Sequence, residues 1–399
     1  MYLNVFFNAV KELIIKHDKK VFICMVLVYT LTIVSLASAT EYTTHAEYTP
    51  FYVSDFSAFL MGAYIIRYDT PSNLYTLNVQ RDYLNQVIKP YIRDQVVLTY
   101  RNPPLLAILF LPFTFMEPKT AFKIYVALSA FIIALGAFIL SEKLKLNLIV
   151  TTTMAFVFFP VISTLLTGQI SSHLFLLLCL IYICILNNNF TWAGLLSSLL
   201  LLKPQHILLI PLLFLAVKLN KKYLISVVIG CVLFIVINTL IFGVHFLPEY
   251  IPYLLTSENH GMGADIDRNF SFMSLILLFT PNPVKGAIAL SAVVYSIFLL
   301  YYLKANKNTE PLIISAFLVA FPSELHVILG DLTVLLIPIA ILLSKYYHTK
   351  NRMFLLLVIY LFFLPFIFLL KVIWISGFLF IIAAILILKT FNSISHPNH

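Results

Sequence analysis

The stretch TWAGLLSSLLLLKPQHILLIPLLFLAV (191–217) is followed by the basic joint KLNKK (218–222) and by the uncharged run YLISVVIGCVLFIVINTLIF (223–242). A run of about 20 apolar residues is long enough for an α-helix to cross the hydrocarbon core of a bilayer. Lysines between two such runs are typical of a short cytoplasmic turn. This stretch therefore predicts membrane-spanning helices joined by short polar turns.

The composition of the whole chain leads to the same fold class. The chain has 399 residues, of which 61% are hydrophobic and only 11% are charged. A soluble protein is about a quarter charged, so this chain could not cover the surface of a soluble fold. The composition excludes a soluble enzyme, a nucleic-acid-binding protein and a disordered chain. We read the net charge of +9 as lysine and arginine in cytoplasmic loops.

We predict an all-α polytopic membrane protein that forms one domain over residues 1–399, with about twelve transmembrane helices at about 20 residues each. The first helix, Val21 to about Ala39, follows a lysine-rich N-terminus. Ala37-Ser38-Ala39 leaves signal-peptide cleavage open, but the length of the run favours an uncleaved helix. The other spans are expected at about 120–140, 148–166, 170–186, 191–203, 205–217, 223–242, 286–303, 311–329, 331–347, 353–370 and 372–389. The pair 191–217 is either two short helices broken at Lys203-Pro204 or one kinked element.

The lysine-rich joints predict the orientation of the chain. With this number of spans they all fall on the side of the N-terminus, so both termini are expected in the cytoplasm. Two long polar stretches, 41–119 and 243–285, then lie outside. The first is too long for an ordinary connection. Within it we expect a short amphipathic helix from Phe56 to Ile66 and an interfacial or re-entrant element from Pro103 to Phe115.

Polar residues interrupt the apolar helices at three places. Ionisable groups within a bilayer are costly, so each place is a candidate for function. They are Gly168-Gln169, the stretch from Lys203 to His206, and Ser323-Glu324-Leu325-His326 with Asp331 beyond it. The alternative to function is a turn between helices at Gly168-Gln169. At Lys203 it is a tight hairpin whose lysine reaches the interface. At Ser323 to His326 it is an ordinary loop with a capping acid. For Lys203 we favour function, because such a lysine does not require Gln and His beside it.

Taken in order, these residues resemble glycosyltransferase family 87. This group of polytopic enzymes within the GT-C superfamily uses polyprenyl-phosphate sugars and is typified by mannosyltransferases. The resemblance covers about residues 50–275 and rests on Asp55-Phe56, Tyr100 with Pro103-Pro104, Gly168-Gln169, Ala193-Gly194-Leu195 before Lys203-Pro204, and Asn269 with Ser271. Two features depart from the family pattern. Arg101-Asn102 is inserted before the prolines, and no aromatic residue shortly precedes His326.

The resemblance implies transfer of a sugar from a polyprenyl-phosphate donor to an acceptor hydroxyl, with inversion. The hydroxyl must lose its proton, and Asp55 is the expected general base; it would also suit the N-cap of the following helix. Lys203, His206, Arg268 and His326 are expected to hold the donor phosphate. Gln169, Tyr100, Asn269 and Glu324 are expected to contact the sugar or the acceptor. We expect no cofactor and no metal, since the lipid phosphate is a good leaving group that lysine or arginine can stabilise. Asp265 and Asp267 could in principle bind a cation, but acidic pairs are common in exposed loops.

The expected partners are a lipid-linked sugar donor, a glycan or glycolipid acceptor and membrane lipids, with no nucleic acid. The protein would lie in the plasma or inner membrane, with its active site on the extracytoplasmic face. The main alternative is a transporter or a flippase for lipid-linked sugars. Such carriers often have internal repeats and charges near the bilayer midplane. We find no repeat in this sequence, and its charges gather in the first outer loop and at helix ends. A catalytically inactive relative is a third reading.

Overall fold

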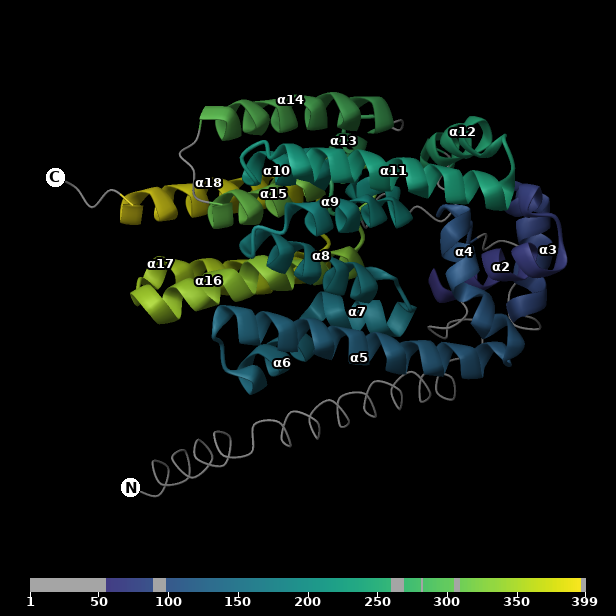
Figure 1. Cartoon of the computed structure of the whole chain (residues 1–399), viewed down its shortest axis with the longest axis horizontal. Coiled ribbons are helices and arrows are strands. Elements are labelled where there is room, and N and C mark those ends of the chain that lie inside the picture. Colours follow the sequence, from purple (N-terminus) through teal and green to yellow (C-terminus); the bar gives the residue numbers. More distant parts are fainter. Residues whose placement is uncertain (1–54, 89–97, 260–268, 281–282, 305–308, 396–399) are drawn as a thin grey trace, which may run out of the picture.

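A computed structural model of the protein describes residues 55–88, 98–259, 269–280, 283–304 and 309–395. Every regular element in these ranges is a helix, which confirms the predicted all-α class for this part of the chain. Long helices lie side by side, and several short helices gather at one end of them (Figure 1). One hydrophobic core runs from Phe56 near the start to Phe391 near the end.

Five helical stretches are long and apolar enough to cross a membrane. They are α5 (Pro118–Leu144), α11 (Lys221–Phe242), α14 (Pro283–Lys304), η7 (Leu329–Leu335) with α16 (Leu336–Thr349), and η9 (Ile373–Ile375) with α18 (Ser376–Ser395). A sixth is obtained if α6 (Leu148–Val157) and α7 (Phe159–Thr167), which are bent by 62°, count as one span. Pro160 lies in the first turn of α7, where it fits the new helix but could not continue the old one.

There are six shorter apolar stretches: five match other predicted spans, and α4 with η3 (104–115) matches the element predicted to be interfacial or re-entrant. They are α4 with η3, described below, α8 (Ser171–Leu186), α9 (Phe190–Ser198) with η4 (Leu199–Leu202), η5 (Pro204–Leu208) with α10 (Leu209–Ala216), α15 (Thr309–Ser323), and α17 (Arg352–Phe363) with η8 (Leu364–Phe368). At about 1.5 Å per residue each falls short of the hydrocarbon core, which is about 30 Å thick. The protein is therefore membrane-embedded and polytopic, while the count of about twelve crossings stays a prediction. The first predicted span, 21–39, lies outside the described residues.

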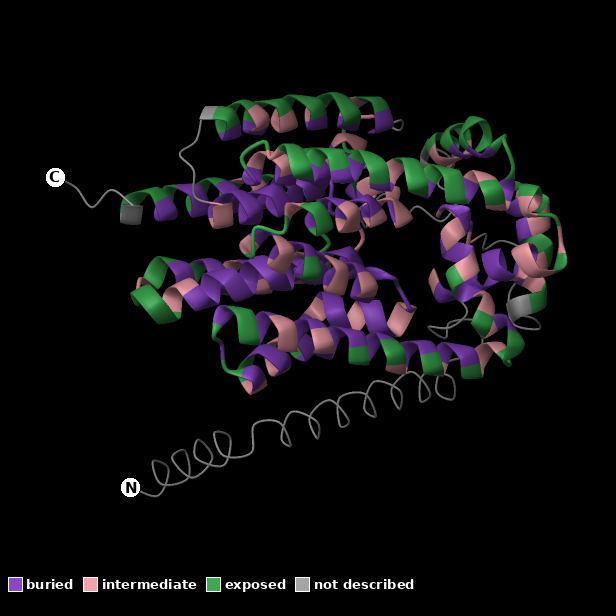
Figure 2. Ribbon diagram, in the orientation of Figure 1, coloured by how far each residue is buried: buried purple, intermediate pink, exposed green. Residues whose placement is uncertain are grey.

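The outer faces of the bundle are apolar, as a lipid-facing surface requires. Figure 2 shows α11 and α14 with much of their surface exposed. The exposed residues there include Val228, Leu240 and Val293, at 53%, 81% and 58% exposure. An exposed apolar area of this extent is a liability for a soluble protein but is favourable in contact with lipid.

Residues 191–217 form two short helices and not one kinked element. Residue 194 has to be glycine, because a Cβ there would lie 2.4 Å from the carbonyl oxygen of Tyr223. The same Cβ would lie 2.8 Å from Cβ of Ser226, and four residues further along each helix Ser198 packs on Gly230, so α9 runs parallel to α11. The chain then breaks at Lys203, whose φ of −130° and ψ of 88° are not helical. Because α10 returns to the start of α11, Lys203 lies at the tip of a helical hairpin.

The predicted span 311–329 is shorter than expected, since α15 ends at Ser323 just after Pro322. The next five residues, 324–328, form no helix. Irregular backbone within a membrane protein must be satisfied by other protein groups. Asn269 and Asp331 supply such groups, as described below. We call residues 324–328 the connecting segment.

Short helices form a layer across one end of the bundle, on the right in Figure 1. We call this the cap layer. It consists of α2 (Asp55–Tyr68), η2 (Pro71–Tyr75), α3 (Leu77–Ile88), α4 (Pro104–Phe110), η3 (Leu111–Phe115) and α12 (Phe246–Asn259). The two predicted outer loops, 41–119 and 243–285, contribute all of these elements. The second loop also contains α13 (Phe272–Leu277).

The helix predicted to be amphipathic, α2, is buried on most sides, and in this respect the prediction was wrong. Nine of its 14 residues are buried, among them Phe56 and Leu60 with no exposure. Aromatic side chains of neighbouring elements pack around its first turn. The ring of Phe56 lies 5.2–5.9 Å, between centroids, from the rings of Phe110, Phe113, Phe122 and Tyr125. This packing fixes the start of α2, where Asp55 lies.

The lysine-bearing turns lie at the end of the bundle opposite the cap layer (Figure 1). Lys143 at the end of α5 donates a hydrogen bond of 2.6 Å to Asn187 after α8. Lys345 in α16 forms an ion pair with Glu310 at the start of α15. These turns therefore share one end of the bundle, as the predicted orientation requires.

Candidate active site

A small polar cavity of about 90 Å³ lies between the cap layer and the helical hairpin. Its wall includes Asp55 from α2, Arg101 before α4, Lys203 and Gln205 from the hairpin tip, and His326 from the connecting segment. These residues are separated by up to 271 positions in the sequence. The structure thus brings the proposed base, the proposed phosphate-binding lysine and His326 to one cavity.

Asp55 is the first residue of α2 and lies partly buried at the cavity wall. Burial raises the pKa of its carboxyl group, because the charged form loses contact with water. The positive charge of Lys203 and a hydrogen bond from Gln169 oppose this rise. A carboxylate with a raised pKa is a better proton acceptor. The place in the first helical turn also suits the α2 dipole, so the two roles expected for Asp55 are compatible.

Lys203 forms a buried ion pair with Asp331 at the start of the η7–α16 span. The exposure of Asp331 is 0%. Asp331 also accepts hydrogen bonds of 3.0 Å from the hydroxyl of Ser171 and of 3.1 Å from the main-chain N–H of Ile328. A buried ion pair is stable only when its remaining polar atoms are satisfied in this way. Sequence analysis noted Asp331 without giving it a role; its only signal was an acid at the start of an apolar span.

His206 and Glu324 form a second buried pair between the hairpin and the connecting segment. Nδ1 of His206 lies 2.9 Å from Oε1 of Glu324. The outer atoms of the pair, Nε2 and Oε2, have no hydrogen-bond partner among the described residues. Buried polar atoms without partners are rare in native structures, and here they are groups that could bind a ligand. Glu324 faces a groove that adjoins the polar cavity.

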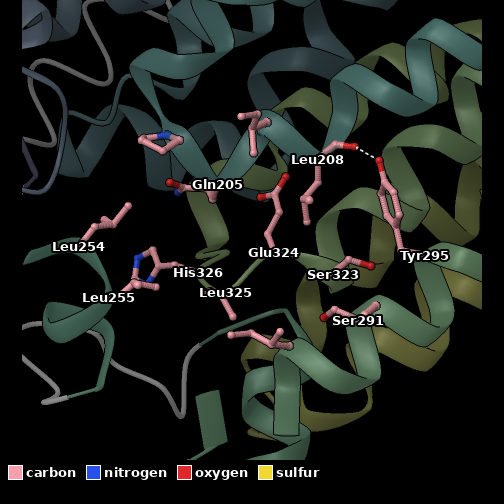
Figure 3. Close-up of a pocket in the computed structure, with 14 residues that line it drawn as sticks. Gln205, Leu208, Leu254, Leu255, Ser291, Tyr295, Ser323, Glu324, Leu325 and His326 are labelled. Carbon is pink, nitrogen blue, oxygen red and sulfur yellow. Dashed lines mark hydrogen bonds between the residues drawn. The ribbon is translucent and has the colours of Figure 1, made fainter. Parts of the chain in front are cut away.

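This groove has a volume of about 380 Å³ and is mainly apolar. It shares Pro204, Gln205, Leu254 and His326 with the polar cavity. Figure 3 shows its wall, built from the hairpin, α12, α14 and the segment 323–326. The Tyr295 hydroxyl of α14 donates a 2.6 Å hydrogen bond to the carbonyl of Leu208 (Figure 3). A polar cavity and an apolar groove thus lie side by side and share part of their wall.

Asn269 lies beside the site but contributes to neither wall. Its amide Nδ2 donates a 2.6 Å hydrogen bond to the Leu325 carbonyl, and its Oδ1 accepts a 2.9 Å bond from the Val327 N–H. Asn269 therefore holds the main chain on both sides of His326. The structure gives it a positioning contact where sequence analysis expected a contact to the sugar.

Gln169 and Tyr100 have different surroundings. Gln169 is buried beside Asp55 and packs closely on Gly330, where an added Cβ would lie 1.9 Å from its Oε1 and displace the amide. Tyr100 is fully buried, and its hydroxyl donates a 2.7 Å hydrogen bond to the Pro103 carbonyl. It lines neither the cavity nor the groove. Arg268, Asp265 and Asp267 lie outside the described residues.

The ion pair of Lys203 and Asp331 allows a test of the site's construction. Asp331→Leu leaves a buried lysine without its partner, so we expect the protein to lose about 3–5 kcal/mol of stability. Lys203→Met leaves a buried aspartate and should cost about as much. The double variant removes both charges and should recover most of the loss in thermal unfolding of the detergent-solubilised protein. A double variant no more stable than the single ones would show that pairing is not what stabilises the two residues.

Comparison with known families gives the class of protein. The family model of glycosyltransferase family 87 matches residues 100–323, just over half of the chain. The match includes Gln169, Lys203 and His206, whereas Asp55 and His326 lie outside it. No curated protein and no solved structure matches the chain. The match favours a glycosyltransferase over a transporter, and the chain is a membrane glycosyltransferase that belongs to glycosyltransferase family 87.

Proposed function

We propose that the protein transfers a sugar from a polyprenyl-phosphate donor to a hydroxyl group of a lipid-linked or envelope glycan, with inversion at the anomeric carbon. Mannose is the first candidate, and another hexose or a pentose is the alternative. The observation that supports this proposal is the position of the polar cavity directly beside the apolar groove, with four residues shared between their walls. A donor with a charged head and an isoprenoid tail needs both, side by side.

In this proposal Asp55 is the general base. The acceptor oxygen forms a bond to the anomeric carbon, and the bond from that carbon to the phosphate oxygen breaks. The acceptor proton passes to the Asp55 carboxylate, and the bonding electrons leave with the polyprenyl phosphate. Negative charge on the phosphate grows during this step, so fixed positive groups beside it lower the barrier. Lys203 and His326 lie in the same cavity wall as Asp55 and meet this need.

The other predicted residues take graded roles. We assign Gln169 and Glu324 to the sugar or the acceptor, because Gln169 bonds Asp55 and Glu324 faces the groove. His206 supports the site through Glu324. Tyr100 and Asn269 act by holding the main chain around the cavity. Arg268 stays a proposed phosphate ligand beyond the described residues.

The proposed orientation places the cap layer and the site on the extracytoplasmic face of the cell membrane. Both termini would be cytoplasmic. The lysine-bearing turns at the opposite end support this orientation, because lysine and arginine accumulate in cytoplasmic turns. The proposal requires no metal, since Lys203 can stabilise the phosphate leaving group.

The assignment of Asp55 can be tested by Asp55→Asn. The amide has almost the same shape but cannot accept the proton, so we expect turnover to fall by about 10²- to 10⁴-fold. Donor binding should be kept, and thermal stability should change little. Asp82→Asn, on the exposed surface of α3, is the matched control and should keep full turnover. Near-normal turnover of Asp55→Asn with a purified lipid donor would refute the assignment.

A second test uses the pH dependence of kcat/KM. Asp55 acts as a base only when deprotonated, so activity is lost as the pH falls through its pKa. Lys203→Ala removes a charge that lowers this pKa, while Asp331, whose charge raises it, stays in place. The acid limb should therefore move to higher pH, and the donor KM should rise by about tenfold or more. If the acid limb of the kcat/KM profile and the donor KM were both unchanged, Lys203 would not belong to the active site.

The groove can be tested with donors of different tail length. Ala292 lines the groove on α14, and Ala292→Trp would fill part of it. We expect the KM for a long-chain donor to rise by about tenfold, or about 1.4 kcal/mol, with little change for a short-prenyl donor. Val293, exposed on the same helix but outside the groove, gives the control Val293→Trp. Equal effects of Ala292→Trp on both donors would place the tail elsewhere.

A further inference from the structure

Arg101 lies in the wall of the polar cavity together with Asp55 and Lys203. It is half of the Arg101-Asn102 pair that separates Tyr100 from the prolines, which is one of the two departures from the family pattern described above. Both residues of the pair line the cavity. A departure from a family pattern inside the site itself is a place to look for a property of this particular chain.

The main chain of the pair is fixed from two sides. The Arg101 carbonyl accepts a 2.9 Å hydrogen bond from the hydroxyl of Tyr250 in α12. The Asn102 amide donates a 2.9 Å bond to the carbonyl of Leu202, directly before Lys203 at the hairpin tip. The pair therefore spans from the cap layer to the hairpin, and Arg101 cannot leave the cavity wall without breaking these contacts.

The guanidinium group is also oriented. Its Nε donates a 3.0 Å hydrogen bond to the hydroxyl of Thr99. This bond restricts rotation of the guanidinium plane, so the planar group is held at the wall in a limited range of directions. A planar guanidinium matches two phosphate oxygens at once, which an ammonium group cannot do.

Leaving His326 aside, the charges at the cavity other than that of Arg101 are unfavourable for an anion. The charge of Lys203 is balanced by Asp331, to which it is bonded. Asp55 in its deprotonated form then leaves one net negative charge beside the place where a phosphodiester must bind. In a medium of low dielectric constant, two like charges in one small cavity repel strongly. Arg101 adds one positive charge, so the charges of Lys203, Asp331, deprotonated Asp55 and Arg101 sum to zero.

We propose that Arg101 binds the phosphate group of a prenyl phosphate and is the cation that makes this cavity able to hold it. The inference rests on the proposed function and names a further ligand of the same site. Lys203 and Arg101 then hold the phosphate from the hairpin side and from the cap-layer side. The phosphate passes from one negative charge in the donor to nearly two in the leaving group. Arg101 therefore interacts more strongly with the product than with the donor.

Direct binding to the full-length protein in detergent tests the inference without turnover. The probes are a prenyl monophosphate and the prenol of the same chain length, which share the tail and differ in the phosphate. The wild-type protein should bind the monophosphate at least about tenfold more tightly than the prenol. Arg101→Gln should abolish most of this difference and leave prenol binding unchanged. Arg101→Lys, which keeps the charge without the planar fork, should restore part of the difference.

Arg81→Gln is the matched control, since Arg81 is exposed on α3 and lines neither the cavity nor the groove. It should keep the full preference for the monophosphate. Prenol binding by Arg101→Gln shows that this variant is folded. If it does not fold, the preference of Arg101→Lys for the monophosphate over the prenol tests the inference instead. An unchanged preference in both Arg101 variants would overturn the inference, as would a wild-type protein that binds both probes equally.

Turnover by the wild-type protein separates this inference from the proposed function. Sugar transfer from a polyprenyl-phosphate donor that is insensitive to Arg101→Gln would keep the function and reject the role of Arg101. Absence of transfer, together with a monophosphate preference that depends on Arg101, would keep the binding site and reject the proposed reaction.

Discussion

The buried ion pair between Lys203 and Asp331 is the constraint on which the site depends. Both charged groups are buried away from water. Burying either one without its partner would cost several kcal/mol, which is on the order of the stability of a whole domain. The pair is affordable only because Ser171 and the Ile328 N–H complete the shell of Asp331. It therefore requires the hairpin, α8 and the connecting segment to meet at one point.

The shape of the site follows from this meeting. Because the hairpin stops at Lys203 and α15 stops at Ser323, neither continues to the end of the bundle that the longer helices reach. The cap layer closes the space beyond the ends of these two elements and supplies Asp55 and Arg101 to the cavity. The interruption of the helices therefore makes room for a polar cavity, and the apolar sides of the same helices make the groove beside it. Short helices are the structural condition for a buried polar site at this depth.

Much of this arrangement was predictable from the sequence, and the rest was not, for physical reasons. An apolar run without charges identifies a helix whatever its neighbours are, so the positions of the helices agree closely with those predicted. The break at Lys203-Pro204 was visible because proline and lysine contradict the apolar run around them. The partner of Lys203 was not visible, since a uniformly apolar helix carries no periodicity that tells which of its ends meets which. The burial of α2 was missed for a related reason: aromatic residues from η3 and α5 cover it, and these lie far from it in the sequence. Asn269 was recognised as a motif, but its bonds to the main chain around His326 could come only from the structure.

The balance of charges also bears on how such an enzyme can discriminate. A cavity with a large positive charge would attract any anion. It would also favour an ion pair between Asp55 and a cation, in which Asp55 could not act as the base. A cavity with a net negative charge would reject the donor. The arrangement here pairs one cation, Lys203, with a buried acid and places a second, Arg101, in the wall of the cavity that also holds the Asp55 carboxylate. Binding of a single phosphodiester then shifts the cavity by one negative charge, and the charge that builds on the phosphate during transfer is met by groups already in place. Such preorganisation costs nothing at the moment of reaction, which is the reason that fixed charges in a dry site stabilise a transition state better than water does.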